Sequence, residues 1–364
     1  MNSFVIGQRK EDLDTPALCL DADALERNIA FMAGFLSDKA ARLRPHFKTH
    51  KCPAIAWQQL RAGAIGITCA KLGEAEVLAQ AGIQDILIAN QLIGTAKIAR
   101  LVNLARHTRV ITATEDAAHV TELAEAAQAK GVRLRTIIEV DVGMGRCGTA
   151  PGEATLRLAQ TICQLPALQF EGLMGYEGHA VMIADLAERR RVAEASLAQL
   201  VDTAELLQAH GIAVQIVSAG GTGTFEITGC YPGITELQCG SYATMDAKYS
   251  SIGLGFEPAL TVLAQVISTQ AADHAVIDAG IKTMTTEFGL PQVASPTGWE
   301  VARLSEEHGI LRRQDKGLPL RRGDRVELIP SHGCTTINLH DAYMVTRDDV
   351  VEAVWPIAGR GMVR

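Results

Sequence analysis

One stretch of the sequence is typical of a parallel β-strand that is buried on both faces: Leu134-Arg135-Thr136-Ile137-Ile138-Glu139-Val140-Asp141. It is short and rich in apolar residues, and it runs directly into the glycine-rich segment Gly143–Gly148. Near-continuous apolar runs of this kind suit strands of a parallel sheet that helices cover on both sides. The stretch therefore predicts an α/β fold.

Seven further runs share this character and surround the first one along the chain. They lie at Arg42–Phe47, Ile65–Ala70, Asp85–Ala89, Thr108–Thr112, Gln169–Met174, Val214–Ser218 and Thr235–Gln238. Between them lie stretches with apolar residues at helical spacing, at Ala22–Ser37, Gly73–Ala81, Thr95–Ala105, Glu115–Lys130, Glu153–Gln164 and Leu186–His210. Eight strands that alternate with helices predict a TIM-like (β/α)8 barrel over residues 22–249. A doubly wound open sheet would alternate in the same way, so the count of strands favours the barrel without proving it.

The pattern changes after Ser250, where strand-like runs follow one another with few helical stretches between them. These runs lie at Leu260–Thr269, His274–Asp278, Arg325–Pro330, Ala342–Thr346 and Val350–Trp355. Several are joined by turn-like segments, which is typical of antiparallel strands. Residues 250–364, together with residues 1–21, are therefore predicted to form a smaller, mostly β domain.

The composition excludes several classes of protein. Of the 364 residues, 48% are hydrophobic and 21% are charged, which is ordinary globular usage and excludes a disordered or fibrous chain. The 34 Lys and Arg against 41 Asp and Glu give a net charge of −7, which does not favour nucleic acid as a partner. No apolar run reaches the roughly 18 residues of a membrane span, and residues 1–14 lack the apolar core of a signal peptide. We therefore expect a cytoplasmic protein without a membrane partner.

The first predicted barrel strand ends in the basic segment Arg44-Pro45-His46-Phe47-Lys48-Thr49-His50-Lys51. Catalytic residues of barrels gather at the carboxyl ends of the strands. A lysine there is desolvated and lies near other positive charges, which lowers its pKa and makes the amine nucleophilic. A basic surface loop is the alternative interpretation of the same residues.

Glycine-rich turns follow three other predicted strands. The first surrounds Arg146, in Gly143-Met144-Gly145-Arg146-Cys147-Gly148, and lets a guanidinium approach a planar anionic group. The other two, Ser218–Thr224 and Cys239-Gly240-Ser241, follow the seventh and eighth strands, where barrels often bind phosphate. A reactive lysine with a phosphate site and a ring site indicates pyridoxal 5′-phosphate, bound as a lysine Schiff base. A barrel aldolase that acts on sugar phosphates could use the same phosphate site.

The second predicted domain contains Pro330-Ser331-His332-Gly333-Cys334. On an extended segment, residues two apart project to the same side, so His332 and Cys334 could both bind one divalent metal ion. A buried cysteine beside a loop histidine is the alternative.

With these residues in view, the chain resembles the D-threonine aldolase and D-serine dehydratase family of fold-type III pyridoxal-phosphate enzymes. The resemblance runs nearly end to end, and its most specific segments are Leu18–Asn28, Arg44–Lys51, Glu139–Gly148, Ser218–Thr224, Glu236–Asp246, Asp278–Lys282, Glu307–Gly309, Pro330–Asp341 and Trp355–Gly361. It implies an alanine-racemase-like fold, a barrel followed by a β domain. It also implies a homodimer in which one subunit completes the active site of the other.

The resemblance implies a role for each of several residues. Lys48 would form the Schiff base, Arg146 would face the ring or O3′ of the coenzyme, and Tyr176 would line the ring pocket. The phosphate would be held by Gly221, Thr222, Gly240 and Ser241, with Tyr242 close by. His332 and Cys334 would bind a divalent metal near the β-hydroxyl of the substrate, and a cysteine ligand favours Zn²⁺ while Mn²⁺ or Mg²⁺ would need oxygen-rich completion of the site.

The sequence carries marks of both branches of the family. Gly145–Gly148, Thr235–Asp246, Asn338–Asp341 and Trp355–Gly361 resemble the aldolases, which cleave D-3-hydroxy-amino acids to glycine and an aldehyde. His332-Gly333-Cys334 resembles the dehydratases, which convert D-serine or D-3-hydroxyaspartate to a 2-oxo acid and ammonia. The larger set of motifs favours the aldolase.

The identity of the catalytic base is a separate question. The base histidine of the aldolases would fall at Met182, so His179 is predicted to act as the base, with Glu177 as an alternative.

Two other functions are compatible with the barrel and its lysine. A non-catalytic pyridoxal-phosphate carrier would not need the second domain. An amino-acid racemase would not need His332 and Cys334.

Overall fold

The computed structural model describes residues 3–314 and 317–364. Contacts divide the chain into two compact units, and each is described here by itself. The barrel unit comprises Met32–Lys48, Ile55–Gly240 and Met362–Arg364, and the β unit comprises Met1–Phe31, Thr49–Ala54 and Ser241–Gly361. The chain therefore passes between the units more than twice. The domain boundaries predicted at residues 21/22 and 249/250 stay a prediction.

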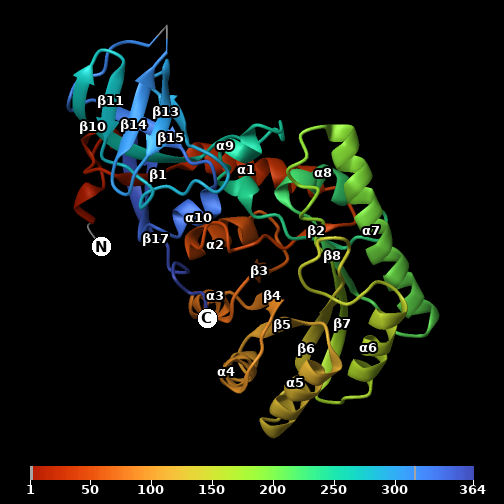
Figure 1. The fold of residues 1–364 in the computed structure, drawn as a ribbon. Coiled ribbons are helices and arrows are strands. Elements are labelled where there is room, and N and C mark those ends of the chain that lie inside the picture. Colours follow the sequence, from red (N-terminus) through yellow and green to blue (C-terminus); the bar gives the residue numbers. More distant parts are fainter. Residues whose placement is uncertain (1–2, 315–316) are drawn as a thin grey trace. The chain divides into compact units, whose positions relative to one another are not determined.

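Eight parallel strands form the sheet of the barrel unit (Figure 1). They are β2 (Arg42–Leu43), β3 (Ile67–Cys69), β4 (Asp85–Gln91), β5 (Arg109–Thr114), β6 (Leu134–Glu139), β7 (Leu168–Met174), β8 (Ile216–Ala219) and β9 (Glu236–Leu237). The order across the sheet is β2-β9-β8-β7-β6-β5-β4-β3. The edges meet through a parallel bridge between His46 and Thr68 and a backbone hydrogen bond of 2.7 Å from Phe47 N to Thr68 O. The sheet is thereby closed into the predicted barrel, and all eight predicted strands are present.

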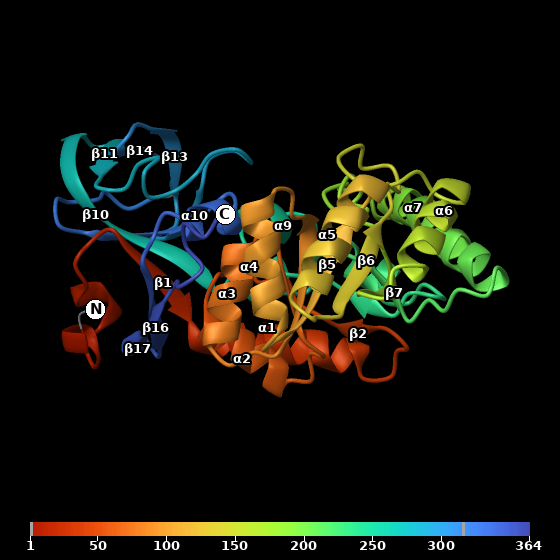
Figure 2. The same cartoon turned by 90° about the horizontal axis from the view of Figure 1, so that it is seen from below.

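Helices cover the outside of this sheet, as Figures 1 and 2 show for α3 to α7. The helices that precede residue 229 are α1 (Ala22–Leu36), which begins in the β unit, α2 (Pro53–Arg61), α3 (Leu72–Gln80), α4 (Thr95–Ala105), α5 (Ala117–Ala129), α6 (Glu153–Cys163), α7 (Leu186–Ala209) and α8 (Phe225–Thr228). Helices α1, α5 and α7 each begin after an aspartate whose carboxylate accepts a hydrogen bond from a backbone N–H of the first turn. Helix α2 had no prediction, and the other long helices match their predicted ranges within two residues.

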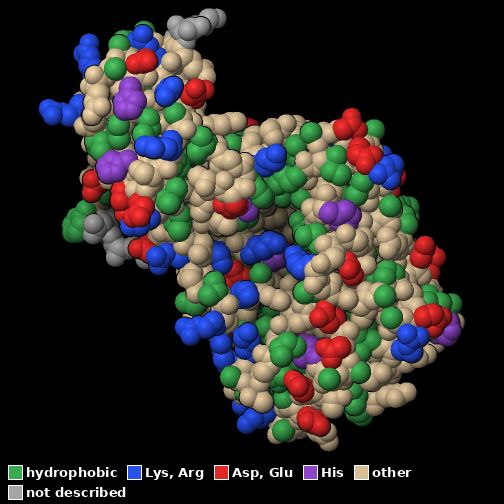
Figure 3. Space-filling view, in the orientation of Figure 1, with side chains coloured by type: hydrophobic (Ala, Val, Ile, Leu, Met, Phe, Trp, Pro, Cys, Tyr) green, Lys and Arg blue, Asp and Glu red, His purple; other side chains and the backbone are tan. Residues whose placement is uncertain are grey.

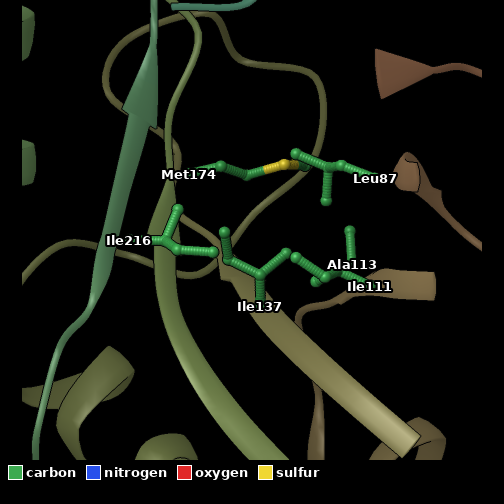
Figure 4. Close-up of a cluster of buried hydrophobic side chains, with 6 residues drawn as sticks. All are labelled: Leu87, Ile111, Ala113, Ile137, Met174 and Ile216. Atoms are coloured by element: carbon green, nitrogen blue, oxygen red, sulfur yellow. The ribbon is translucent and has the colours of Figure 1, made fainter. Parts of the chain in front are cut away.

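The interior of the barrel is filled by side chains from alternate positions of the strands. Six of them point toward one another in Figure 4: Leu87, Ile111, Ala113, Ile137, Met174 and Ile216. They come from β4, β5, β6, β7 and β8, and Leu87, Ile111 and Ile137 are fully buried. Each buried leucine or isoleucine stabilises the fold by roughly 1.5–3 kcal/mol. The barrel is therefore a packed core at this level, and its chemistry must lie at the ends of the strands.

A second layer inside the barrel unit is ionic. The Arg44 guanidinium donates two hydrogen bonds to Glu236, at 2.9 and 2.8 Å, and a third to Asp85 at 2.5 Å. Arg135 donates to Glu171 at 2.7 Å and lies 3.7 Å from Asp85. Since Asp85 and Glu236 are the first residues of β4 and β9, this network lies toward the amino ends of the strands. Arg44 is thus part of the support of the barrel and does not belong to the cluster of strand-end residues around Lys48.

The β unit contains a nine-stranded, mainly antiparallel sheet. Its strands are β1 (Ala17–Asp21), β10 (Leu260–Ala271), β11 (His274–Ile277), β12 (Gln292–Ser295), β13 (Trp299–Leu304), β14 (Gly309–Arg313), β15 (Arg325–Ile329), β16 (Ala342–Arg347) and β17 (Val350–Pro356). Two short helices, α9 (Ala247–Ser250) and α10 (Gly333–Ile337), belong to the same unit. Strand β1 pairs antiparallel with β10 and parallel with β16, so the first strand of the chain belongs to this sheet.

Three strands and two short helices of the β unit had no prediction: β12, β13, β14, α9 and α10. Strand β12 is mostly exposed, and β13 alternates buried Trp299 and Val301 with exposed residues, so neither contains a continuous apolar run. Helix α10 is too short, at five residues, for a helical period to be visible.

Acidic and basic side chains are both scattered over the face shown in Figure 3. Among the described residues, no helix has the length and apolar character that a membrane crossing requires.

Candidate active site

Three residues from three strand ends converge in the barrel unit. Lys48 follows β2, Tyr176 follows β7, and Arg146 lies in the loop after β6. The Lys48 amine lies 5.7 Å from the centroid of the Tyr176 ring, and the Arg146 guanidinium lies 5.8 Å from the same centroid. One aromatic ring therefore lies within reach of two cations, both held at the carboxyl end of the barrel.

The residues around Lys48 are not a surface loop. His46, His50 and Lys51 are buried, and Lys48 itself is half-buried. The backbone N–H of Lys48 donates to Nδ1 of His46 at 3.4 Å. The alternative of a basic surface loop is therefore wrong, and the chain is fixed on the amino-terminal side of the lysine.

Arg146 is supported by a chain of polar groups that the sequence analysis did not identify. Its guanidinium lies 3.5 Å from Glu139, and the Gln91 amide donates to Glu139 at 2.6 Å and to Glu115 at 3.1 Å. One carboxylate oxygen each of Glu115 and Glu139 and the sulfur of Cys147 lie within 4.8 Å of one another. Gln91 and Glu139 end β4 and β6, and Glu115 follows β5, so their positions at strand ends were a signal in the sequence.

The glycine-rich turn after β8 brings its backbone unusually close to neighbouring groups. A Cβ atom on Gly223 would lie 1.9 Å from the carbonyl oxygen of Val181. A Cβ on Gly221 would lie 2.9 Å from a Val181 methyl group and 3.1 Å from the Tyr176 ring. Glycine is therefore required at both positions, and the turn lies directly beside Tyr176.

The other residues predicted to hold phosphate follow β9. Gln238 N donates to Ala219 O at 2.9 Å, so the ends of β8 and β9, and with them Gly220 and Gly240, lie side by side. Thr222 is buried in the first turn.

Ser241 and Tyr242 belong to the β unit. Ser241 Oγ lies 3.7 Å from the Cys334 sulfur, and Tyr242 is fully buried with its ring 5.6 Å from that of Phe256.

The two candidates for the base differ sharply in their surroundings. His179 is exposed, lies against Gly143, and has Nε2 3.4 Å from Ser196 Oγ. Glu177 is fully buried, and its two oxygens accept hydrogen bonds from Gly220 N, Thr224 Oγ1 and Thr228 Oγ1. Because Glu177 is buried and both of its oxygens already accept hydrogen bonds, a substrate hydroxyl cannot reach it. The geometry therefore argues against Glu177 as the base.

In the β unit, His332 and Cys334 form a coupled pair. His332 Nδ1 lies 2.6 Å from Glu287, and Cys334 lies 3.3 Å from Thr49 Oγ1. Burial would lower the pKa of His332, but the hydrogen bond and charge of Cys334, with Asp246 and Glu287, raise it to about 9. Burial would raise the pKa of Cys334, but the hydrogen bond and charge of His332 lower it overall. Both shifts favour an imidazolium beside a thiolate.

The prediction that His332 and Cys334 lie on an extended segment is wrong, although the two side chains do interact. The segment is not extended throughout, because Cys334 lies in the first turn of α10 and only His332, at its N-cap, has extended backbone. Glu287, which lies 45 residues earlier, had no prediction.

Comparison with known proteins agrees with this arrangement. Residues 20–248 match the family described as "Alanine racemase, N-terminal domain", and residues 259–346 match the "Putative serine dehydratase domain". A D-threonine aldolase of Arthrobacter sp. is 39% identical over 97% of this chain and 94% of its own length. The chain belongs to the D-threonine aldolase and D-serine dehydratase family of fold-type III pyridoxal-phosphate enzymes. This is the family that the sequence motifs indicate.

Other members of this family show the same relation. A 3-hydroxy-D-aspartate aldolase of Paracoccus denitrificans (strain Pd 1222) is 36% identical over 98% of this chain and 94% of its own. The crystal structure of D-threonine aldolase from Filomicrobium marinum has a TM-score of 0.95 at 37% identity, covering 99% of both chains. Relatives named as dehydratases are more distant, at 31% identity or less. The predicted alanine-racemase-like fold is confirmed.

The residues present fit the coenzyme of this family. Gly221 and Gly223 leave no room for a side chain, and Gly221 lies directly beside the ring that Lys48 and Arg146 approach. A lysine amine, an aromatic ring and a glycine turn are the groups that such a cofactor requires.

The donor set of the β unit fits a divalent metal ion. An imidazole and a thiolate are ligands that Zn²⁺ prefers, and a carboxylate on the other ring nitrogen is the usual support of a histidine ligand.

Proposed function

We propose that this protein is a pyridoxal-phosphate-dependent, metal-assisted aldolase that cleaves D-3-hydroxy-amino acids to glycine and an aldehyde. The convergence of Lys48 and Arg146 on the Tyr176 ring, at the carboxyl end of a barrel, carries the proposal for the coenzyme. The identity of 36–39% to aldolases over nearly the whole chain, against 31% or less to dehydratases, supports carbon–carbon cleavage.

The residues of the barrel unit would hold the coenzyme from several sides. Lys48 would hold it through a Schiff base, Arg146 and Tyr176 would lie at its ring, and Gly221, Thr222 and Gly240 would bind its phosphate. The family resemblance adds Ser241 and Tyr242 to the phosphate-binding residues. When bound, pyridoxal phosphate supplies an electron-accepting ring that stabilises the negative charge left on Cα. Glu139 holds the Arg146 guanidinium and limits its movement.

His179 is proposed to accept the proton of the β-hydroxyl. Its Nε2 faces Ser196, which leaves Nδ1 as the atom that receives the proton. The side chain is exposed and is therefore open to a substrate, in contrast to the buried Glu177.

His332 and Cys334 are proposed as the metal ligands, and Glu287 orients the imidazole ring. When bound, a divalent ion supplies a Lewis acid that lowers the pKa of a hydroxyl coordinated to it. Zn²⁺ suits the thiolate best, and Mn²⁺ or Mg²⁺ would draw on oxygen ligands in addition.

A dehydratase is the second candidate, because His332 is paired with a thiol as in the dehydratase branch that the sequence resembles. A product assay separates the two. Metal-replete protein is incubated with D-threonine and with a D-3-phenylserine, and glycine and 2-oxo acids are measured. The aldolase gives glycine and aldehyde, whereas 2-oxobutyrate without glycine would assign the protein to the dehydratases.

Replacing the lysine tests the coenzyme. Lys48→Ala should abolish the yellow Schiff-base absorbance and all product, because the bond is proposed to form at the Lys48 amine. Lys97→Ala, at an exposed position of α4, is the matched control and should retain both. Colour that persists in Lys48→Ala would show that another residue binds the coenzyme.

We also propose a homodimer, which the family resemblance implies, and a cytoplasmic location. Light scattering of the purified protein after size exclusion tests the first, and fractionation of the source cells tests the second.

A further inference from the structure

Glu177 is a fully buried carboxylate that the proposed reaction does not use. It directly follows Tyr176, whose ring is approached by both Lys48 and Arg146. Its hydrogen-bond partners in the described part of the chain are all neutral groups. A buried charge without a cation is costly unless it is well supplied with hydrogen bonds, so these partners must matter to the fold of the segment that provides them.

All three donors come from one short segment, the glycine-rich turn after β8 and the helix α8 that continues it. Gly220 N donates to one oxygen of Glu177 at 3.1 Å, while Thr224 Oγ1 and Thr228 Oγ1 donate to the other at 2.7 and 2.6 Å. Both hydroxyl distances lie at the short end of the range for O–H···O hydrogen bonds. Glu177 therefore joins the start of the turn, its end and the following helix at a single point.

The contact extends further into the turn through Thr224. Its hydroxyl donates to Glu177 and accepts a hydrogen bond from Gly221 N at 3.2 Å. The backbone N–H groups of Gly220 and Gly221 are thus directed into the protein, toward Glu177 and Thr224. Burial is the largest cause that raises the pKa of the Cys239 thiol, and the charge of Glu177 is the second largest. The carboxylate therefore also lies near Cys239, the residue before Gly240.

We propose that Glu177 is a positioning residue that fixes the conformation of the Gly220–Thr224 turn for the phosphate group of the coenzyme. The inference rests on the proposed function, because it assigns this turn to the phosphate. A carboxylate suits this position because both of its oxygens accept, one from Gly220 N–H and the other from two hydroxyls. A glutamine would direct its N–H₂ group either at Gly220 N–H, which cannot accept, or at the two threonine hydroxyls, which would have to accept and give up their present donation.

The test compares two forms of the coenzyme that differ only in the phosphate. Wild type and Glu177→Gln are titrated with pyridoxal phosphate and with pyridoxal, and the Schiff-base absorbance gives the Kd of each. In Glu177→Gln we expect the Kd of pyridoxal phosphate to rise by about tenfold or more, and that of pyridoxal to change by less than about twofold. Glu226→Gln, an exposed position of α8 beside the same turn, is the matched control and should change neither.

The inference is overturned if the ratio of the two Kd values, for pyridoxal phosphate and for pyridoxal, is the same in Glu177→Gln as in wild type. This includes the case in which both Kd values rise by the same factor, which indicates a general loss of structure. Thr224→Val removes a donor to Glu177 and the acceptor of Gly221 N, so it should show the same selective loss and decides the matter if Glu177→Gln does not fold. A wild type that gives no Schiff-base absorbance would overturn the proposed function itself, whereas a coloured wild type with an unaltered variant overturns only the role of Glu177.

Discussion

Tyr176 and Glu177 are neighbours in the sequence with opposite surroundings. Tyr176 is half-buried and approached by two cations, whereas Glu177 is enclosed and bonded to three uncharged donors. On the proposed function, two consecutive residues after one strand would serve the ring and the phosphate parts of the same site. A change in the backbone at this strand end would disturb both parts together.

At the same scale, the pairing of His332 with Cys334 predicts how the metal-free protein responds to pH. The imidazolium lowers the pKa of the Cys334 thiol, against the effect of burial. In His332→Gln that charge is gone, so the pKa of the thiol should rise and less thiolate should exist at pH 7. Alkylation of Cys334 by iodoacetamide should then slow by about tenfold for each unit of that rise.

Mass spectrometry of the peptide that carries Cys334, after metal removal, measures this rate against pH. Exposed Cys163 and Cys230 serve as internal controls, and their rates should not depend on the substitution. Equal rates for Cys334 in the two proteins at pH 7 would show that His332 does not hold the thiolate.

At the scale of elements, removing the ionic layer near the amino ends of the barrel strands should lower the unfolding free energy. Arg44→Ala would leave Glu236 and Asp85 without their shared cation in a buried setting. Breaking a buried pair in this way costs about 3–5 kcal/mol of unfolding free energy. Urea denaturation followed by circular dichroism measures the change.

A surface pair in the same unit is the matched control. Arg191 also forms two hydrogen bonds to a glutamate, Glu188, but the two side chains are 69% and 47% exposed. Arg191→Ala should therefore cost about 0–1 kcal/mol. A similar cost for the two variants would mean that the buried layer does not support the barrel.

Most elements of the barrel were predictable because they have strong local signals, although helices α2 and α8 had no prediction. A buried parallel strand is a continuous apolar run, and Asp21 before α1 is a recognisable N-cap. The weaker signals of the β unit explain its missed strands, since β12 exposes most of its residues to solvent and β13 exposes alternate ones.

The candidate site was predictable only in part, for a related reason. The rule that chemistry gathers at strand ends indicated Lys48 and Arg146, and the structure brings both to Tyr176. It did not indicate which strand-end side chains turn inward, as Glu177 does, nor partners that come from distant segments, such as Glu287 for His332. Those contacts depend on tertiary packing, which leaves no pattern of fixed spacing in the sequence.

For the whole molecule, the division into two units predicts that coenzyme and metal can be removed independently. Lys48, Arg146 and Tyr176 lie in the barrel unit, whereas His332 and Cys334 lie in the β unit. Dialysis against a chelator should therefore abolish glycine formation but leave the Schiff-base absorbance in place. Adding Zn²⁺ or Mn²⁺ back should restore product, and loss of the colour together with the metal would contradict this separation.

The points at which the chain passes from one unit to the other lead to one more expectation. Two of them fall at Lys48/Thr49 and at Gly240/Ser241, so a hybrid joined after Gly240 would inherit its lysine from one parent and its His-x-Cys motif from another. The segment of a dehydratase relative that corresponds to residues 241–361 could be joined to this barrel. The products of the hybrid would show which part of the chain determines the bond that breaks. Such chimaeras, assayed for both products, could trace how one ancestral scaffold gave rise to two chemistries.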